Sequence, residues 1–317
     1  MMEPIHILHL SRLKVHNANA MSSPYIVGFP SITAWLGMVH KLERELHVAG
    51  YPLHLKATSV VCHQMDLQTY KPKGDYKSLI ISTANPSKLK NGKLIRPSFI
   101  AEARCHLTVS LAIIVEGEAL NGLEHQQLHN CIESLLHAKV KAASGNIEEI
   151  GRINLDVINS DDQLNTSTKS LLPGYVLIDR NDLLKEALKE SSNSKLDDLD
   201  IFLEFFSLMH SYVQNNEDVN EDKSIENETY EWLSSRKEKG WLVPLAVGYQ
   251  GISDLGLILN RRDENTPHRF AESILSVAEF KMPIGYDFSD LHELFWQYKY
   301  DELNQLYLCK QAEPFFN

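Results

Sequence analysis

The sequence lacks the features that mark a membrane-spanning or secreted protein. No run of about eighteen apolar residues, the length that a transmembrane helix needs, occurs in its 317 residues. The N-terminal stretch MMEPIHILHLSRLKV has neither a basic n-region nor a small-residue cleavage site, which argues against a secretory signal. The four cysteines show no CxxC spacing, which favours reduced thiols over a disulfide framework. We therefore expect a cytoplasmic protein with no membrane partner.

The sequence also lacks the motifs of common enzyme and cofactor sites. Its glycines are isolated, so it has no P-loop, no dinucleotide-binding fingerprint and no GxSxG nucleophile motif. His125 and His129 have the i, i+4 spacing of a helical metal site, but the Glu that a metalloprotease motif places beside the first His is absent. We expect no cofactor and no catalytic residue set.

Two Cys-His pairs raise the hypothesis of a zinc site, because two Cys and two His form a common tetrahedral donor set. They are Cys62-His63 and Cys105-His106. Both pairs lie on predicted strands, where adjacent side chains point to opposite faces, so four ligands cannot converge without a bulge. We expect small buried cysteines at these positions and no metal.

The net charge of −11 hides an uneven distribution along the chain. Residues 1–110 carry a net charge of +7, whereas the remaining residues carry −18. A basic part joined to an acidic part favours one surface that binds a polyanion, such as nucleic acid, and a second surface that contacts something else. For the acidic part, a surface that merely keeps the protein soluble is the simpler interpretation.

Hydrophobic patterns predict an α+β fold in the first 180 residues. In chain order we expect a strand at 5–15, a helix from Ser31 to near Gly50, strands at 55–66 and 101–115, a helix at 125–140, and a strand at 150–158 or 172–179. This β-α-β-β-α-β order is that of the ferredoxin-like fold. One face of the strand at 101–115 is apolar, and the other is polar without Phe or Tyr, so bases are not expected to stack on it.

A long segment at 70–98 separates the second and third predicted strands. It is rich in Lys, and Asp75 is its only acidic residue. Loops of this length inside a compact domain are usually functional or disordered. We interpret the segment as a projecting basic insertion with a short ribbon near Leu79–Ser82.

The pattern predicts a domain at 1–180 and a C-terminal α/β extension at 181–317. In the extension we expect helices at 181–190 and 196–213, a solvated and mobile acidic tract at 214–229, and a turn segment at 260–270. The spacing of Leu291, Leu294, Phe295 and Tyr298 predicts a C-terminal helix.

Polar, turn-forming residues are dense in the stretch VHNANAMSSPYIVGFPSITAWLG, which begins at Val15. Asn17, Asn19, Ser22 and Ser23 supply hydrogen-bond donors and acceptors, and the prolines and glycine should hold the segment out of regular structure. Such a surface suits phosphates, sugar hydroxyls and base edges. Helix capping and turn closure explain the same residues equally well.

The run RLKVHNANAMSSPYIVGFPSITAWLGMVHKLER resembles the N-terminal motif of a known family, the second Csy subunit of the type I-F CRISPR surveillance complex, within the RAMP superfamily. Further blocks agree with that family along most of the chain, namely VVCHQ, EARCHLTVSL, LLPGYVLI, GWLVP and ENTPHRFAESIL. No match is evident at 181–235.

The resemblance implies a noncatalytic, RNA-binding subunit of the RNA-guided antiviral complex, with an RNA-recognition-module-like, ferredoxin-like core. It implies pairing with the large Csy subunit, contact with the backbone Csy subunit, and a grip on the five-prime handle of the CRISPR RNA (crRNA), and it leaves contact with target DNA open. The polar stretch would then be a cradle for single-stranded RNA. The residues expected to bind RNA are Arg12, Lys14, Asn17, Asn19, Ser22, Ser23, Lys71, Lys73, Lys77, Arg104, His268 and Arg269.

Two other functions stay open at this point. Some RAMP relatives cut RNA with a histidine, so a metal-independent endoribonuclease that processes precursor crRNA is one alternative, with His40 or His63 as the first candidates. A purely protein-interacting scaffold subunit is the other alternative. Its docking surface would be the apolar face formed by Leu199, Phe202, Phe206, Met209 and Val213.

Overall fold

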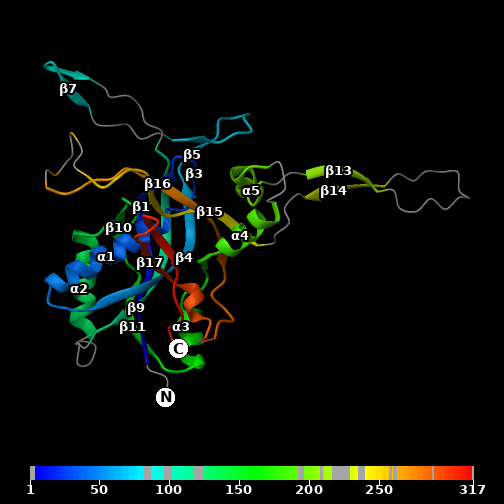
Figure 1. Ribbon diagram of the computed structural model, residues 1–317. Coiled ribbons are helices and arrows are strands. Elements are labelled where there is room, and N and C mark those ends of the chain that lie inside the picture. The colour runs from blue at the N-terminus through cyan, green and yellow to red at the C-terminus, as the bar shows by residue number, and fades with distance from the viewer. Residues whose placement is uncertain are drawn as a thin grey trace, which may run out of the picture.

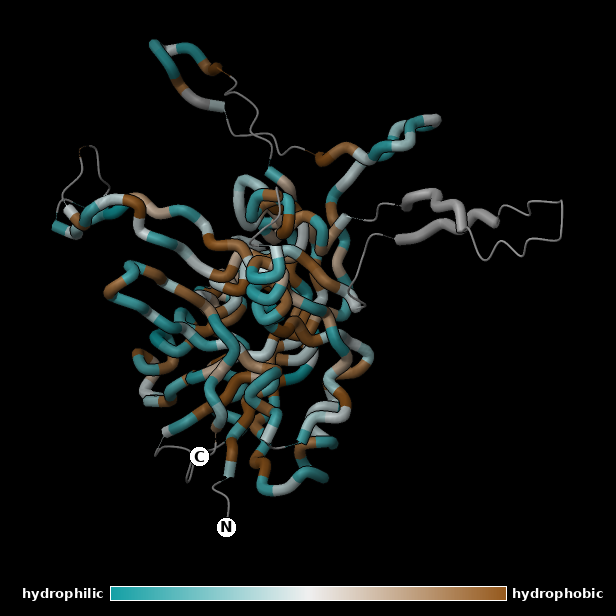
Figure 2. Tube along the Cα trace, turned by 45° about the vertical axis from the view of Figure 1, so that its right-hand side comes forward, coloured by the Kyte–Doolittle hydropathy of each residue, from teal (hydrophilic) through white to brown (hydrophobic). Residues whose placement is uncertain are grey.

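The computed structural model shows an α+β protein built on a large antiparallel sheet (Figure 1). It describes residues 4–81, 87–95, 102–117, 125–191, 196–207, 210–215, 229–234, 240–256, 259, 263, 265–287 and 289–315. Hydrophobic residues are concentrated along the elements of the body, from which several hairpins project (Figure 2). Among the described residues, no helix is both long and apolar enough to cross a bilayer.

The first part of the chain contains the predicted succession of strands and helices. Its main elements are β1 (Ile5–Asn19), α1 (Ile32–Val48), β4 (His54–Leu67), β9 (Arg104–Glu116), α2 (His125–Ala138), β10 (Asn146–Glu149) and β11 (Arg152–Ile158). β1 lies between β9 and the pair β10 and β11, and β9 lies between β1 and β4, with all neighbours antiparallel. The predicted elements of this part are therefore confirmed.

Helix α1 follows directly from its sequence pattern. Its buried residues recur at helical spacing and face the main core, and Ser31 occupies the N-cap position. Gly50, with a φ of +91°, lies just beyond the C-cap residue, where a left-handed backbone ends many helices. The helix packs against α2 and β4 and also against three late strands, so it joins early and late parts of the chain. These strands are β15 (Trp241–Gly251), β17 (Trp296–Asp301) and β18 (Leu306–Gln311).

The strand β1 is longer than predicted and includes both asparagines of the polar stretch, Asn17 and Asn19. Its pairing with β9 shifts between Leu10 and Leu13 and again between Val15 and Ala18. Arg12 and Asn17 lie at these irregularities with φ angles of +50° and +59°. After Asn19, β2 (Met21–Ser23) and β3 (Ile26–Val27) form a small hairpin. The expectation that this stretch lies outside regular structure is therefore wrong for most of its length, because β-bulges accommodate its polar residues within paired strands.

The second part of the sheet comes from later segments of the chain. These are β12 (Tyr175–Asp179), β15 (Trp241–Gly251), β16 (Ala271–Lys281), β17 (Trp296–Asp301) and β18 (Leu306–Gln311). β12 pairs with both β4 and β16, and the order then runs through β15 and β18 to β17, whose Trp296 pairs with Thr58 of β4. The C-terminal segment thus continues the sheet of the first part, and the division near residue 180 stays a prediction.

The sheet has core on both faces. One core cluster includes the inner residues of α1 and α2. The other includes residues of α3 (Asp161–Lys169) and of the 3-10 helix η3 (Leu291–Leu294). The sequence predicted no helix at α3, although Ser160 is an N-cap whose side chain accepts a hydrogen bond from the N–H of Gln163.

Several predictions for the C-terminal part are wrong. The helix α4 (Asn181–Glu190) is present as predicted, but the next helix, α5, spans only Asp198–Glu204. Residues His210–Asn215 form β13, which pairs with β14 (Thr229–Ser234), and residues 216–228 of the acidic tract lie outside the described residues. The predicted C-terminal helix is a single 3-10 turn followed by β17, because Leu294, Phe295 and Trp296 are all needed in the core.

The proposed docking face at 196–213 does not exist as one helical surface. Phe202 is buried, and Phe206 is partly buried against it, in a small cluster that includes side chains of α4, β15 and β16. Leu199 is exposed, Val213 belongs to β13, and Met209 lies outside the described residues.

The basic insertion projects from the body, as the sequence predicts (Figure 1). It contains two hairpins, formed by β5 (Thr69–Tyr70) with β6 (Leu79–Ile80) and by β7 (Lys88–Lys90) with β8 (Lys93–Ile95). Residues 82–86 and 96–98 lie outside the described residues.

Candidate nucleic-acid interface

A groove of about 600 Å³ lies beside the N-terminal half of α1, where the helix faces β15, β17 and β18. We call it the α1 groove and define it by its polar side chains, Asn19, Ser22, His40, Lys41, Arg44, Lys141, Tyr249, Tyr298 and Tyr307. Ser31 also lines it, so the first turn of α1 with its free N–H groups borders the groove. The positive end of a helix dipole favours anions at this position.

The groove carries more positive charge than its own ion pairs neutralise. Lys41 binds the carboxylate of Glu45, which also accepts a hydrogen bond from Lys139 at 2.7 Å. The two lysines, Lys139 first, lower the pKa of Glu45 to about 2, so this carboxylate is ionised. Arg44 and Lys141 form no ion pair with any described residue. These two cations are therefore free to bind an anionic ligand.

Aromatic rings form another wall of the groove. The rings of Tyr298 and Tyr307 lie with their centroids 5.1 Å apart, and burial is the main cause that raises the pKa of both phenols. Both side chains stay neutral in the physiological range. Tyr249 and Tyr307 are 41% and 39% exposed, which leaves ring surface on which a base can stack.

The polar stretch contributes to the groove through Asn19 and Ser22. The side chain of Asn19 accepts a hydrogen bond from the N–H of Met21 and donates one to the carbonyl of Met21, which closes a local turn. Ser23 is buried, and its hydroxyl accepts a hydrogen bond from the N–H of Tyr25. Ser22 differs, because its buried Oγ has no hydrogen-bond partner among the described residues. Turn closure thus accounts for Asn19 and Ser23 but leaves the hydroxyl of Ser22 unexplained.

The remaining predicted residues of β1 and β9 surround a different part of the sheet. Lys14 binds Glu149 at 2.6 Å and lines a smaller hollow of about 270 Å³ together with His106. The N–H of Asn17 donates to Nδ1 of His106 at 3.2 Å. Arg104 binds Glu102 at 2.7 Å. Ion pairs therefore neutralise both Lys14 and Arg104, and the structure does not bring them into one cradle with Ser22.

Arg12 lies in a third setting. The guanidinium of Arg12 donates a hydrogen bond to the carbonyl of Leu172 at 3.2 Å, and the backbone N–H of Arg12 donates one to Oγ of Ser110. Ser110 is buried, so the polar face predicted for β9 is open only toward the start of the strand. Arg12 ties β1 to the segment before β12.

The last predicted residues lie at the periphery. Lys71, Lys73 and Lys77 are exposed on the insertion and form no ion pair within the described parts of the chain. His268 pairs through its backbone with Gly256, and the side chain of Arg269 lies against Gly251. Nδ1 of His268 and Nε of Arg269 are buried without a partner among the described residues. Both residues lie next to the β15–β16 hairpin, outside the lining of the α1 groove.

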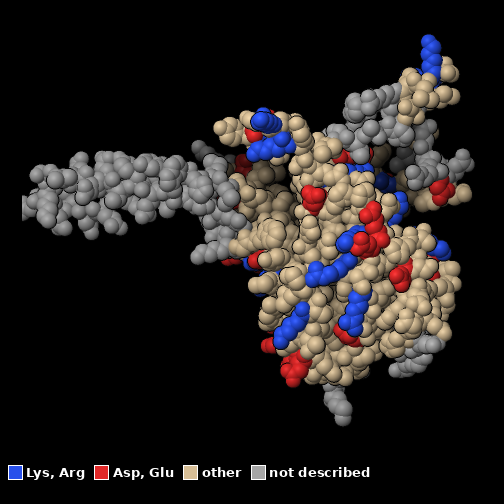
Figure 3. Space-filling model, turned by 180° about the vertical axis from the view of Figure 1, so that it is seen from behind, with Lys and Arg blue, Asp and Glu red and all other residues tan. Residues whose placement is uncertain are grey.

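The excess of Lys and Arg in residues 1–110 does not form one continuous basic patch on the face of the molecule opposite to that of Figure 1. On that face, Lys and Arg side chains alternate with Asp and Glu across a mainly uncharged surface (Figure 3). Lys14, Lys56 and Arg104 each pair with a carboxylate. The net positive charge of residues 1–110 therefore overstates the number of unpaired cations that are available to bind a polyanion.

The two Cys-His pairs do not converge on a metal. Cys62 and Cys105 lie in the main core, where burial raises the pKa of their thiols to about 11 and about 12. His63 lies between Oγ of Ser110 at 2.6 Å and the carbonyl of Pro173, and burial is the main cause that lowers its pKa. The ring of His106 contacts the N–H of Asn17 and the side chain of Gln68.

The residues that distinguish the α1 groove were not among those predicted from the sequence motifs. Arg44 lies on the polar side of α1, a helix that the sequence predicts, whereas Lys141 lies in the segment between α2 and β10. For Arg44, the signal was its position opposite the apolar stripe of α1. Lys141 lies beyond the end of α2, so no helical pattern pointed to it. The tyrosines gave no such signal, because they come from strands that the sequence pattern did not reveal.

Comparison with known proteins identifies the family. The family model described as CRISPR-associated protein (Cas_Csy2) matches residues 8–309. The chain belongs to the Csy2 family. The CRISPR-associated protein Csy2 of Pseudomonas aeruginosa (strain UCBPP-PA14) is 29% identical over 322 residues, which cover 96% of this chain and 95% of that relative. The resemblance in the sequence motifs is confirmed, and membership of the Csy2 family makes the chain a subunit of a type I-F CRISPR complex that functions in antiviral defence with partner subunits.

Proposed function

We propose that this Csy2-family chain is a noncatalytic, cytoplasmic RNA-binding subunit that holds the five-prime handle of the crRNA. The observation that carries the proposal is the α1 groove. It combines two cations without ion-pair partners among the described residues, Arg44 and Lys141, with exposed tyrosine rings and the first turn of a helix. Cations for phosphates beside rings for bases are the combination that single-stranded nucleic acid requires.

We infer further that the first part of the sheet is a ferredoxin-like unit of the RAMP type. The strand order β11-β1-β9-β4 with antiparallel neighbours supports this inference, as do the positions of α1 between β1 and β4 and of α2 between β9 and β10. RNA-recognition modules bind bases on the open face of such a sheet. Here both faces bear core clusters, which favours binding through the α1 groove and loops instead.

The endoribonuclease alternative needs a histidine that can exchange a proton with RNA. His63 is a poor candidate, because both ring nitrogens already have partners. His40 is exposed and lines the α1 groove, so it is the residue to test. The same groove contains Lys41 and tyrosine hydroxyls, which are groups that can act with a histidine in acid–base catalysis, so His40→Ala is the variant that decides between the two functions.

The proposed partners are the crRNA, the large Csy subunit and the backbone Csy subunit. The insertion supports a role in protein contact, because it exposes large apolar side chains beside its lysines. These include Tyr76, Leu89 and Leu94, which are 97%, 74% and 73% exposed. A partner surface that covers them would gain hydrophobic burial. Under the scaffold alternative, the chain makes this protein contact and does not bind RNA.

One experiment separates the three functions. The chain is co-expressed with the large Csy subunit, and the heterodimer is given a labelled precursor RNA that contains the repeat, with and without divalent metal. We expect the RNA to be bound and to stay intact. Metal-independent cutting that His40→Ala abolishes would support the endoribonuclease, and absence of RNA binding by an intact heterodimer would support the scaffold.

A further inference from the structure

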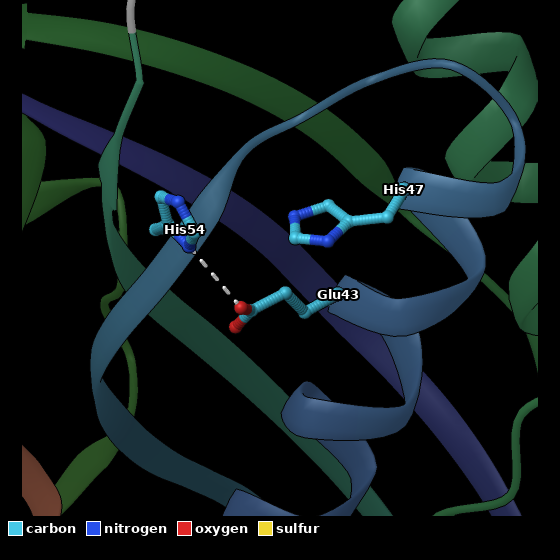
Figure 4. Close-up of side chains that lie close together, drawn as sticks. All are labelled: Glu43, His47 and His54. Atoms are coloured by element: carbon cyan, nitrogen blue, oxygen red, sulfur yellow. Dashed lines mark ion pairs between the residues drawn. The ribbon is translucent and has the colours of Figure 1, made fainter.

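Three potential metal ligands meet at the C-terminal end of α1. Glu43 and His47 lie one helical turn apart on α1, and His54 opens β4 (Figure 4). One ligand atom from each lies within 4.8 Å of the others. The spacing i, i+4 puts Glu43 and His47 on one side of the helix. The turn through Gly50 then returns the chain so that His54 faces them.

Backbone groups already orient two of the three side chains. Nε2 of His47 lies 2.8 Å from the carbonyl of Leu53, so the N–H on Nε2 donates and the lone pair stays on Nδ1. Oε2 of Glu43 accepts a hydrogen bond from the N–H of Leu55 at 3.1 Å, and the other oxygen, Oε1, faces His54. Such hydrogen bonds to the outer atoms of ligands are typical of protein metal sites, where they fix the orientation of imidazoles and carboxylates.

The charge of the cluster favours a cation. The side chain of Glu43 is only 21% exposed, and its one ionic contact within the described residues is Nδ1 of His54 at 3.5 Å from Oε1. No Lys or Arg among the described residues pairs with this carboxylate. A partly buried carboxylate without a cationic partner is costly unless another cation binds.

The donor set selects the class of metal. Two imidazoles with one carboxylate are a known zinc-binding combination, whereas Mg²⁺ and Ca²⁺ prefer oxygen ligands alone. Two ligands on one tetrahedral Zn²⁺ lie about 3.4 Å apart. The separation of 3.5 Å between Oε1 of Glu43 and Nδ1 of His54 is close to that value, and the ligand atoms of all three residues lie within 4.8 Å of one another.

We propose that Glu43, His47 and His54 bind a divalent first-row transition metal, best matched by Zn²⁺, with water in the remaining position. The bound ion would link the end of α1 to the start of β4 across the turn at 49–53. Because α1 also carries Arg44, this metal-mediated link would stabilise the position of the helix that lines the α1 groove. Nothing in this proposal depends on RNA binding.

The test measures Zn²⁺ affinity and thermal stability on the full chain. The protein is stripped with a chelator and titrated with Zn²⁺ against a coloured zinc indicator, alone and with excess Mg²⁺. We expect binding that Mg²⁺ does not displace and a melting temperature that rises with Zn²⁺. Glu43→Gln and His54→Ala should each weaken Zn²⁺ binding by about 10- to 100-fold or more, and remove the rise in melting temperature.

A matched control comes from the second i, i+4 histidine pair. His125 and His129 lie on α2 with ring centroids 6.4 Å apart. The double variant His125→Ala with His129→Ala should bind Zn²⁺ as the wild type does. The proposal is wrong if the wild type does not bind Zn²⁺, if Glu43→Gln and His54→Ala retain wild-type affinity, or if only the control variant loses it. Glu43→Gln keeps an oxygen for the N–H of Leu55, so loss of binding by this variant with an unchanged melting temperature in chelator is not a folding defect.

Discussion

The α1 groove and the basic insertion are both rich in cations, but they differ in what surrounds those cations. In the groove, Arg44 and Lys141 lie beside tyrosine rings and a helix N-terminus. In the insertion, Lys71 and Lys73 are exposed on a hairpin that projects into solvent. A site that fixes both phosphates and bases can distinguish one RNA from another, whereas exposed charge attracts any polyanion. A high density of Lys and Arg in the sequence therefore predicts only a general attraction to polyanions. A specific RNA-binding site can be recognised only from the fold, which places cations beside aromatic rings.

The largest effect is expected from removing the free cations of the groove. The double variant Arg44→Ala with Lys141→Ala should weaken handle binding by about 2–4 kcal/mol, because it removes two charge-assisted hydrogen-bonding groups. The log–log salt dependence should also flatten by about 0.7 for each phosphate that the variant no longer neutralises. Binding is measured on the heterodimer over a range of salt concentrations.

The matched control for that variant is Lys56→Ala. Lys56 is exposed but pairs with Glu116, and it does not line the groove. Its removal should leave both affinity and salt slope unchanged. Equal losses in the control and the groove variant would mean that overall charge, rather than the groove, determines RNA binding.

A smaller effect is expected from the aromatic wall. Tyr249→Leu should weaken binding of the handle by about 1–3 kcal/mol if a base stacks on the ring, without changing the salt slope. Tyr300→Leu is the control, because Tyr300 is 62% exposed on β17 but does not line the groove. Unchanged affinity in Tyr249→Leu, with a normal melting temperature, would show that no base occupies this wall.

Asn19 tests whether the polar stretch serves the site or the fold. Its side chain closes a turn with Met21, so Asn19→Ala should lower the free energy of unfolding by about 1 kcal/mol. We expect the preference for native over scrambled handle to fall as well, measured beside thermal melting. Early melting with an unchanged preference would limit Asn19 to turn closure.

The smallest effect on affinity is expected from the insertion. Replacing Lys71, Lys73 and Lys77 together by Ala should weaken binding by about 1 kcal/mol or less, since exposed ionic contacts contribute little. The loss should be equal for native and scrambled RNA, with a flatter salt dependence. A selective loss for the native handle in competition binding would instead make the insertion part of the specific site.

The sequence predicted those parts of the fold that depend on local patterns. α1 has a continuous apolar stripe and a Gly50 suited to its end, and its limits agree with the structure. The length of β1 could not be predicted, because β-bulges let Asn17 lie in a strand despite its turn-like surroundings. The spacing of Leu291 and Leu294 fits a helix and a single 3-10 turn equally well, and only tertiary packing decides between them.

The candidate site was harder to predict than the fold. Asn19 and Ser22 of the predicted cradle do line the groove, but Lys14 and Arg104 are neutralised by ion pairs elsewhere. The groove joins residues from α1, the segment after α2 and three late strands. Tyr249, Tyr298 and Tyr307 are far from α1 in sequence, so no local pattern could assign them to the same site.

The most direct test of the central claim is to map where the crRNA handle contacts this chain. Photoreactive uridines are placed in the handle of the assembled complex, and crosslinked peptides are identified by mass spectrometry. We predict crosslinks within α1, at 141–144, and on the strands that carry Tyr249, Tyr298 and Tyr307. Crosslinks confined to the insertion at 70–98, or none on this chain in a complex that contains intact crRNA, would contradict the account.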